Sequence, residues 1–75
     1  MIGMYNMDES ILKLIANKRV ALKKRTLKND KIVIGKVKLF KSSKGYSIEL
    51  KEGFDIYYID NKDISNWELL RVIGE

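Results

Sequence analysis

Apolar side chains near the start of the chain recur at helical spacing. They fall four residues apart in the pairs Ile11/Ile15 and Leu12/Ala16. Side chains so spaced share one face of a helix. Asn6 and Glu9 resemble a capping box, a pair that often begins a helix. The pattern predicts a helix over residues 7–17, lying across the mouth of the structure that follows, and a flexible lead at residues 1–6.

From residue 18 onward the apolar period changes to two, the period of a strand. Val20 and Leu22 alternate with Arg19, Ala21 and Lys23, and both are expected to point inward. The next run, residues 32–40, also alternates. One of its faces carries Val33, Gly35, Val37 and Leu39, and the other carries Ile32, Ile34, Lys36, Lys38 and Phe40. A glycine in mid-strand marks a bulge or a sharp bend, so Gly35 predicts a strand that serves two sheets.

Three further strands complete the pattern. They are expected at residues 46–50, 54–59 and 67–73, with turns at 52–53 and 60–63 and one 3₁₀ turn at 64–66. The chain therefore reads as one mainly β domain over residues 1–75. Its five short strands lie within residues 18–73 and follow a single helix.

This order of elements resembles the SH3-like barrels, and with the helix first it is most similar to the Sm-like variant. The run Gly35-Lys36-Val37-Lys38-Leu39-Phe40 is similar to the Sm-like pattern of glycine, basic residue, aliphatic residue and then phenylalanine at a loop. The resemblance implies a small five-stranded SH3/Sm-like barrel with one N-terminal helix. It does not extend to the uridine-binding residues of Sm-like proteins, because Lys41, Gly45 and Asp60-Asn61 stand at the corresponding places.

The same order, with its basic first half, also resembles two other groups of small bacterial barrels. They are the Veg-like proteins and the Rof-like inhibitors of transcription termination.

Lys is frequent and Pro is absent, a bias that favours an AT-rich bacterial or phage genome. No apolar run approaches the roughly 18 residues that span a bilayer, and no signal peptide is recognisable, so a cytoplasmic protein without membrane contact is expected.

Composition narrows the classes of function. The 75 residues include no Cys and no His, which removes thiolate nucleophiles, imidazole bases and the usual ligand sets of zinc and haem. A chain of this length also offers little room for a deep catalytic cleft. A non-enzymatic regulatory binding module is therefore predicted, with no catalytic residue, metal or cofactor.

Charge is the most informative feature of the sequence. Residues 11–44 hold 12 of the 15 basic side chains and a single acid, whereas residues 45–75 carry a net negative charge. Strand parity predicts one basic sheet face, with Phe40 and Tyr46 as a stacking platform. The residues expected to contact nucleic acid, either DNA or RNA with little base selectivity, are Arg19, Lys23, Arg25, Lys36, Lys38, Phe40, Lys41 and Lys44.

An alternative is a protein-binding adaptor, or a phage-type inhibitor of a host enzyme, that acts through the aromatic C-terminal half. Tyr57 and Ile59 have parity opposite to that of Phe54, Ile56 and Tyr58, so something must cover them. The helix, a second copy joined by β-edge pairing, and a host protein are the three candidates. The interface residues of this alternative are Tyr57, Ile59 and Trp67.

Overall fold

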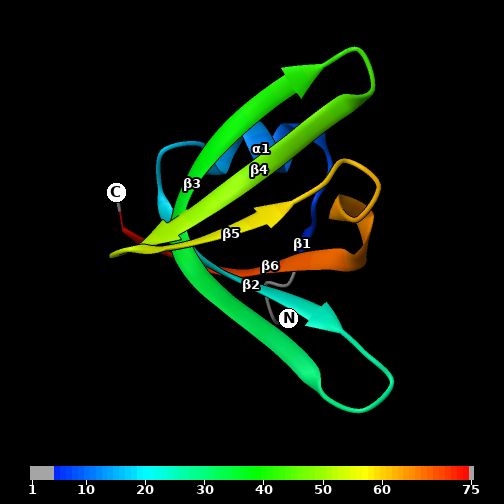
Figure 1. Cartoon of the computed structure of the whole chain (residues 1–75), viewed down its shortest axis with the longest axis vertical. Coiled ribbons are helices and arrows are strands. Elements are labelled where there is room, and N and C mark those ends of the chain that lie inside the picture. The colour runs from blue at the N-terminus through cyan, green and yellow to red at the C-terminus, as the bar shows by residue number, and fades with distance from the viewer. Residues whose placement is uncertain (1–4, 75) are drawn as a thin grey trace.

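The computed structural model describes residues 5–74 of the chain, which form a curved antiparallel sheet with one helix packed on it (Figure 1). The elements are β1 (Tyr5–Asn6), α1 (Glu9–Ile15), β2 (Arg19–Arg25), β3 (Asp30–Ser42), β4 (Gly45–Glu52), β5 (Asp55–Ile59), η1 (Ile64–Asn66) and β6 (Trp67–Gly74). The strand order is β1-β6-β2-β3-β4-β5. The prediction of a mainly β chain with five principal strands and an N-terminal helix is confirmed.

The longest strand, β3, belongs to both halves of the sheet. Its first half pairs with β2 from Asp30 to Lys36, and its second half pairs with β4 from Lys36 to Ser42. The change of partner occurs beside Gly35. A Cβ atom at Gly35 would lie 3.0 Å from the backbone nitrogen of Lys51 and 3.1 Å from the carbonyl carbon of Leu50. Gly35 therefore permits the close approach of β4 at the bend, as its position in the strand predicted.

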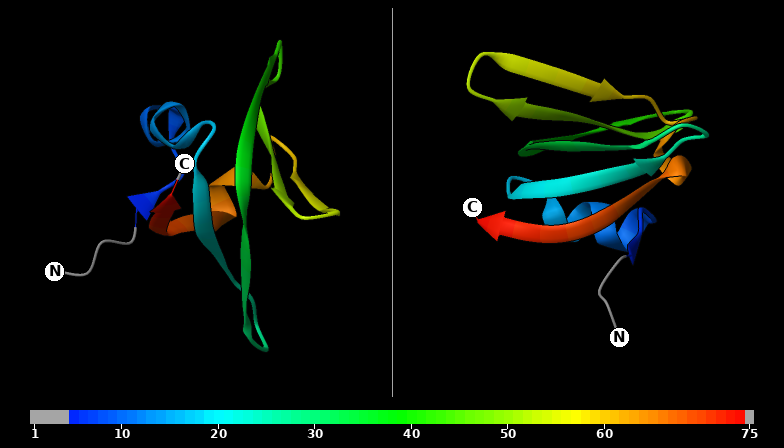
Figure 2. Two further views of the ribbon diagram at one scale, coloured as in Figure 1. Left: turned by 90° about the vertical axis from the view of Figure 1, so that its left-hand side faces the viewer. Right: turned by 90° about the horizontal axis from the view of Figure 1, so that it is seen from below.

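The sheet is strongly curved, as the two turned views show (Figure 2). Its order ends in β1 on one side and β5 on the other, and within residues 5–74 no ladder of hydrogen bonds joins these two edges. The described strands are thus a rolled sheet that is open in its hydrogen bonding. β1 has only two residues and pairs with Glu68 and Leu69 of β6, so it covers a small part of that edge.

The helix starts later than the sequence suggested. Asp8, not Asn6, is the N-cap, and its side chain accepts a hydrogen bond of 3.0 Å from the backbone nitrogen of Ile11. Asn6 cannot cap α1 because it is already extended and paired with Glu68. The predicted flexible lead is therefore wrong for residues 5 and 6, while residues 1–4 lie outside the described part of the chain. Asn17 follows α1 with a φ of 67°, a left-handed conformation that asparagine tolerates well.

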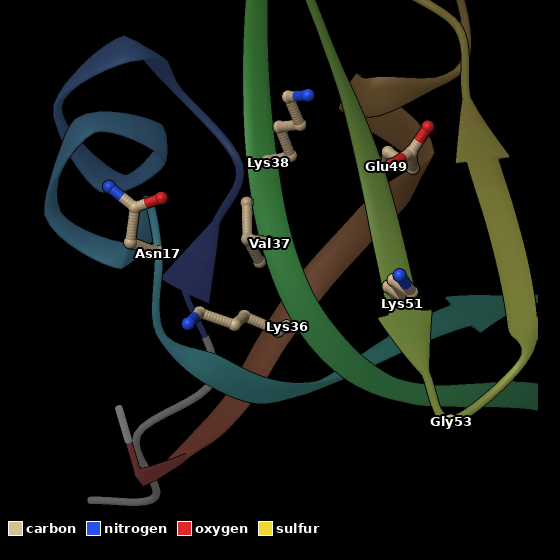
Figure 3. Close-up of a pocket in the computed structure, with 7 residues that line it drawn as sticks. All are labelled: Asn17, Lys36, Val37, Lys38, Glu49, Lys51 and Gly53. Carbon is tan, nitrogen blue, oxygen red and sulfur yellow. The ribbon is translucent and has the colours of Figure 1, made fainter.

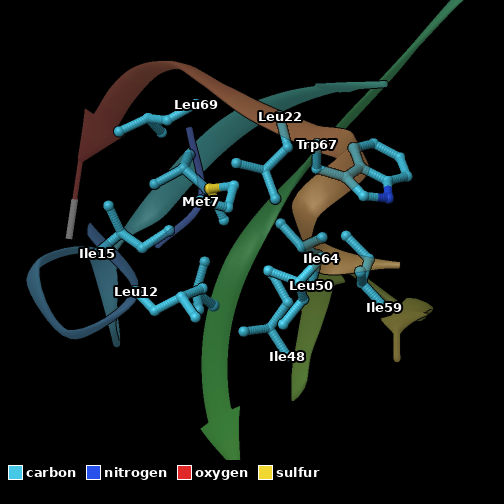
Figure 4. Packing of buried hydrophobic residues seen from close by; sticks show 12 residues of the cluster. Met7, Leu12, Ile15, Leu22, Ile48, Leu50, Ile59, Ile64, Trp67 and Leu69 are labelled. Carbon is cyan, nitrogen blue, oxygen red and sulfur yellow. The ribbon is translucent and has the colours of Figure 1, made fainter. Parts of the chain in front are cut away.

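The core is built from the inward-facing residues of the strands together with one face of α1 (Figure 4). Val20, Leu22 and Val37 are buried as their parity predicted. Ala21, expected outside, is also buried. Trp67 is the largest fully buried side chain, and its ring meets that of Tyr57 edge-on at 5.6 Å between centroids.

Asp63 fastens the 3₁₀ turn to the sheet. Its carboxylate accepts hydrogen bonds from Asn66 (2.9 Å), from the indole nitrogen of Trp67 (3.0 Å) and from the ammonium of Lys24 (3.0 Å). These donors, Asn66 foremost, stabilise the ionised form and lower the pKa of Asp63 to about 2. The turn therefore depends on a charged carboxylate that also satisfies the one polar atom of the buried Trp67.

Candidate nucleic-acid interface

The outer face of β3 and β4 aligns side chains in two transverse rows that are set by strand register. In the first row Arg19 lies opposite Lys36, and Lys36 lies opposite Lys51. In the second row Lys38 lies opposite Glu49, and Glu49 lies opposite Tyr58. Residues opposite one another in a sheet have Cβ atoms about 5 Å apart. The rows therefore bring charged groups from three strands together.

A surface depression of about 380 Å³ lies over these rows (Figure 3). Its lining comes from β3, β4, the segment between α1 and β2, and the β4–β5 turn: Asn17, Lys36, Val37, Lys38, Glu49, Lys51 and Gly53. The backbone bonds Asn17 N to Val37 O (2.9 Å) and Val37 N to Lys18 O (3.0 Å) hold the end of α1 against β3. The depression is thus walled by segments that are distant in sequence but joined by backbone hydrogen bonds.

We call Lys36, Lys38 and Lys51 the lysine patch. Within residues 5–74 none of these three ammonium groups takes part in an ion pair. With Glu49 between them, the four groups carry a net charge of +2. Like charges directly opposite one another in a sheet are destabilising, so the Lys36–Lys51 pair has an electrostatic cost that an anion between them would relieve.

The structure neutralises part of the expected basic face. Arg19 forms a two-pronged ion pair with Glu52, with 2.9 Å between Nε and Oε1. The hydrogen bonds from Arg19 lower the pKa of Glu52. Lys23 pairs with Asp30 at 3.1 Å, and its side chain is only 19% exposed.

Arg25 adds little to the lysine patch. It lies opposite Asp30 at the far end of the β2–β3 ladder. Between Arg25 and Arg19, Ile32 lies opposite Lys23 and Ile34 lies opposite Ala21. These apolar residues, together with the acids paired to Arg19 and Lys23, divide the expected single basic face.

Lys41 and Lys44 also lie away from the lysine patch. Lys41 shares the parity of the buried Val37, and its ammonium sits 5.6 Å from the ring centroid of Tyr46. Tyr46 donates a hydrogen bond of 3.4 Å to Glu9 of α1. Lys44 is in the β3–β4 turn, where its carbonyl accepts from Asn61.

The expected stacking platform is wrong in one member. Phe40 is on the outer face, 36% exposed, with the ammonium of Lys38 5.4 Å from its ring centroid. Its cross-strand neighbour is Ser47, whereas Tyr46 pairs with Lys41 and packs against the core on the other face. Phe40 and Tyr46 are therefore on opposite sides of the sheet.

The three residues expected at a protein interface are not available on this surface. Ile59 and Trp67 are buried, and Tyr57 packs against the core beside Trp67. The protein's own core therefore covers Tyr57 and Ile59, the side chains of β5 that were expected to need another cover. The exposed apolar groups of this region are the opposite set, Phe54, Ile56 and Tyr58.

A second depression, of about 320 Å³, lies between the first half of β3 and the end of the β4–β5 hairpin. Ile32, Ile34 and Ile56 belong to its apolar lining, and Glu52 and Asp55 are its acidic lining residues. It occupies the region where β4 has ended and, among the strands of residues 5–74, none pairs with the first half of β3 on that side. Its character is apolar with acidic groups, unlike that of the lysine patch.

Four residues of the outer face were missed by sequence reasoning: Asn17, Glu49, Lys51 and Tyr58. Lys51 and Tyr58 were not recognised because they belong to the acidic half of the chain, and only the strand register brings them beside β3. Asn17 was read as a helix stop, which it is, but it also lines the larger depression. The one sequence signal for Lys51 was that it shares the strand parity of Glu49, two residues away, which places both on the same face of β4.

The described residues show neither a metal site nor a membrane span. Across residues 5–74 no three side chains of His, Cys, Asp or Glu come close enough to hold a metal ion. Nor does this part of the chain contain a helix of the length and apolar character needed to cross a bilayer.

Comparisons of the sequence with protein-family models and with curated proteins, and of the fold with solved structures, find no match.

Proposed function

We propose that this protein is a non-enzymatic regulatory module that binds nucleic acid through the lysine patch. The observation that carries the proposal is the convergence of Lys36, Lys38 and Lys51 on one depression, free of ion pairs among the described residues. Lys36 and Lys51 lie directly opposite each other and Lys38 is two residues along the same face of β3, a spacing that suits the closely spaced charges of a phosphate backbone.

The local electrostatics support an anionic ligand. The Lys36–Lys51 pair breaks the rule that opposite residues in a sheet avoid like charges, and such local violations are typical of functional sites. The nearby acid Glu52 is already engaged by Arg19, so it competes less with a bound phosphate. Backbone contacts of this kind give affinity with little sequence preference.

We also propose that the fold is an SH3/Sm-like barrel. The support is the order β6-β2-β3-β4-β5, the bend at Gly35 that shares β3 between two ladders, and the 3₁₀ turn before the last strand. In such a barrel, closure between β5 and the edge formed by β1 and β6 would depend on side-chain packing and not on a ladder of backbone hydrogen bonds.

Salt dependence tests the proposed function. Contact with about three phosphates gives a slope of log affinity against log salt of roughly −2 for a single strand and roughly −3 for a duplex. The double variant Lys36→Glu with Lys38→Glu should weaken binding to every sequence and flatten that slope by about 1.5 to 2. Fluorescence anisotropy with labelled oligonucleotides at several salt concentrations measures both quantities.

The matched control is Lys28→Glu with Lys62→Glu. Both residues are exposed, Lys28 before β3 and Lys62 after β5, and neither lines the depression. The net charge changes equally in the two double variants. An equal loss of affinity in both would show that overall charge, and not the lysine patch, carries the binding.

A protein partner is the second candidate. It is favoured by Phe54 and Ile56, which are exposed at the β4–β5 hairpin beside the second depression. Capture of partners from a bacterial lysate, with and without nuclease, separates the candidates, because a protein complex survives the nuclease. Loss of that complex in Phe54→Ser, with nucleic-acid affinity unchanged, would support this candidate.

A further inference from the structure

We infer that the lysine patch, together with Glu49 and Tyr58 beside it, binds single-stranded nucleic acid and prefers strands that contain guanine. This inference rests on the proposed function, since it names the base that the same face would select. It is carried by the second transverse row, in which Lys38, Glu49 and Tyr58 come from three neighbouring strands. That row places a cation, a hydrogen-bond acceptor and an aromatic ring side by side.

The aromatic rings favour a single strand over a duplex. Tyr58 is on the outer face and is 57% exposed, and Phe40 is exposed on the same face beyond Lys38. A surface ring stabilises a base by stacking only when that base is unpaired and free to leave its neighbours. In a duplex each base face is covered by its stacked neighbours, so Tyr58 and Phe40 could not stabilise a duplex by stacking.

Glu49 is the unexpected member of the row. A site for phosphates alone gains nothing from a carboxylate, because the negative charge repels the ligand. Glu49 is half-buried between Lys38 and Lys51, yet within the described chain its side chain makes neither an ion pair nor a hydrogen bond. Both oxygens of the carboxylate are thus open to accept from a ligand.

Guanine is the base whose donors match a carboxylate. Its Watson–Crick edge presents two adjacent N–H groups, which the two oxygens can accept together as a charge-assisted pair. Thymine and uracil present one N–H between two carbonyl oxygens, which the carboxylate would repel. Tyr58 lies directly opposite Glu49 on the neighbouring strand, about 4.8 Å away, so a base stacked on its ring would have the carboxylate beside it.

The experiment compares two labelled strands of about 12 nucleotides, one all dT and one with dG at every third position, by fluorescence anisotropy. The native protein should prefer the dG strand by about tenfold or more. Glu49→Gln should lose most of that preference. It should also bind the all-dT strand more tightly, because a negative charge has been removed beside the phosphates.

The loss of preference distinguishes the inference from simple electrostatics, which predicts that Glu49→Gln binds both strands more tightly by the same factor and so keeps the preference. That result, or a duplex bound as tightly as the single strand, would overturn the inference and leave the proposed function standing. Absence of salt-dependent binding to any strand would overturn both. Tyr58→Leu should lower the affinity for both strands about tenfold without changing the slope of log affinity against log salt. An unchanged affinity would count against stacking on Tyr58.

Discussion

Reversing the charge of Lys36 should make the protein more stable and a weaker binder at once. Lys36 is the middle member of a row in which Arg19 and Lys51 lie directly opposite it. A glutamate there meets a cation on both sides. Cross-strand charge pairs are worth roughly 0.2–1 kcal/mol each, so turning the Lys36–Lys51 repulsion into attraction raises the free energy of unfolding by about 0.5 kcal/mol or more. Arg19, on the other side, adds less, because its guanidinium is already paired with Glu52.

Lys38→Glu is the matched control, two residues away on the same face of the same strand. Lys38 lies opposite Glu49, so this reversal turns an attractive pair into a repulsive one. It should lower the free energy of unfolding by about 0.5 kcal/mol. Both variants change the charge of the lysine patch by the same amount, and both should weaken nucleic-acid binding. The pair therefore separates the effect on folding from the effect on binding.

Urea unfolding followed by tryptophan fluorescence measures the effect, because Trp67 is the single tryptophan and is fully buried. The midpoints of the two variants should move in opposite directions at about 0.1 M salt, where screening extends over about 10 Å. The difference should shrink at about 1 M salt, where that length falls to about 3 Å. Midpoints that move in the same direction would refute the register-based account of this face.

Three further predictions concern the sheet. Gly35→Ala should lower stability by about 1–3 kcal/mol, because the new methyl group meets backbone atoms of β4 at 3.0–3.1 Å; Gly74→Ala, with nothing within 4 Å, should be close to neutral in the same denaturation assay. Asp63→Asn should cost on the order of 1–2 kcal/mol at pH 7. Because the pKa of Asp63 is about 2 in the folded protein and 3.8 as its reference value, that stabilisation is complete above about pH 4 and is lost as the pH falls towards 2, so the gap between native and variant should close there. The free edge of β5, which has neither Pro nor Lys, should support association of two copies at high concentration; light scattering should show a concentration-dependent mass that Ile56→Lys abolishes, and a strictly monomeric mass would end the idea.

Strand parity could be predicted because it depends on neighbouring residues. The alternation of Val20, Leu22 and Val37 with charged residues predicted the buried face, and Gly35 predicted the bend. The start of the helix could not be predicted in the same way. Asn6 and Asp8 are both good caps, and the choice between them was made by the pairing of Asn6 with β6, a contact across most of the chain.

The candidate site was predicted in part for the same reason. Lys36 and Lys38 share a face of one strand, so parity alone brought them together. Lys51 and Glu49 join them only through the register of β4, which the sequence does not specify. Ion pairs between distant segments, such as Arg19 with Glu52, removed other cations from the expected surface. Tyr57 and Ile59 were expected to need a cover from the helix, a second copy or a host protein, whereas Ile59 belongs to the protein's own core and Tyr57 packs against that core.

The sharing of β3 has a consequence for how the domain folds. Lys36 is the residue at which the β2 ladder ends and the β4 ladder begins, so neither hairpin can lose β3 without disturbing the other. The two halves are therefore expected to form and melt as one cooperative unit. The three lysines of the patch lie in the β3–β4 ladder, whereas Asn17, which also lines the depression, comes from the segment before β2, so the complete depression exists only once both halves have assembled. A peptide of the β3–β4 hairpin alone would hold the three lysines but not the wall that Asn17 supplies, and an isolated hairpin is only marginally stable in water.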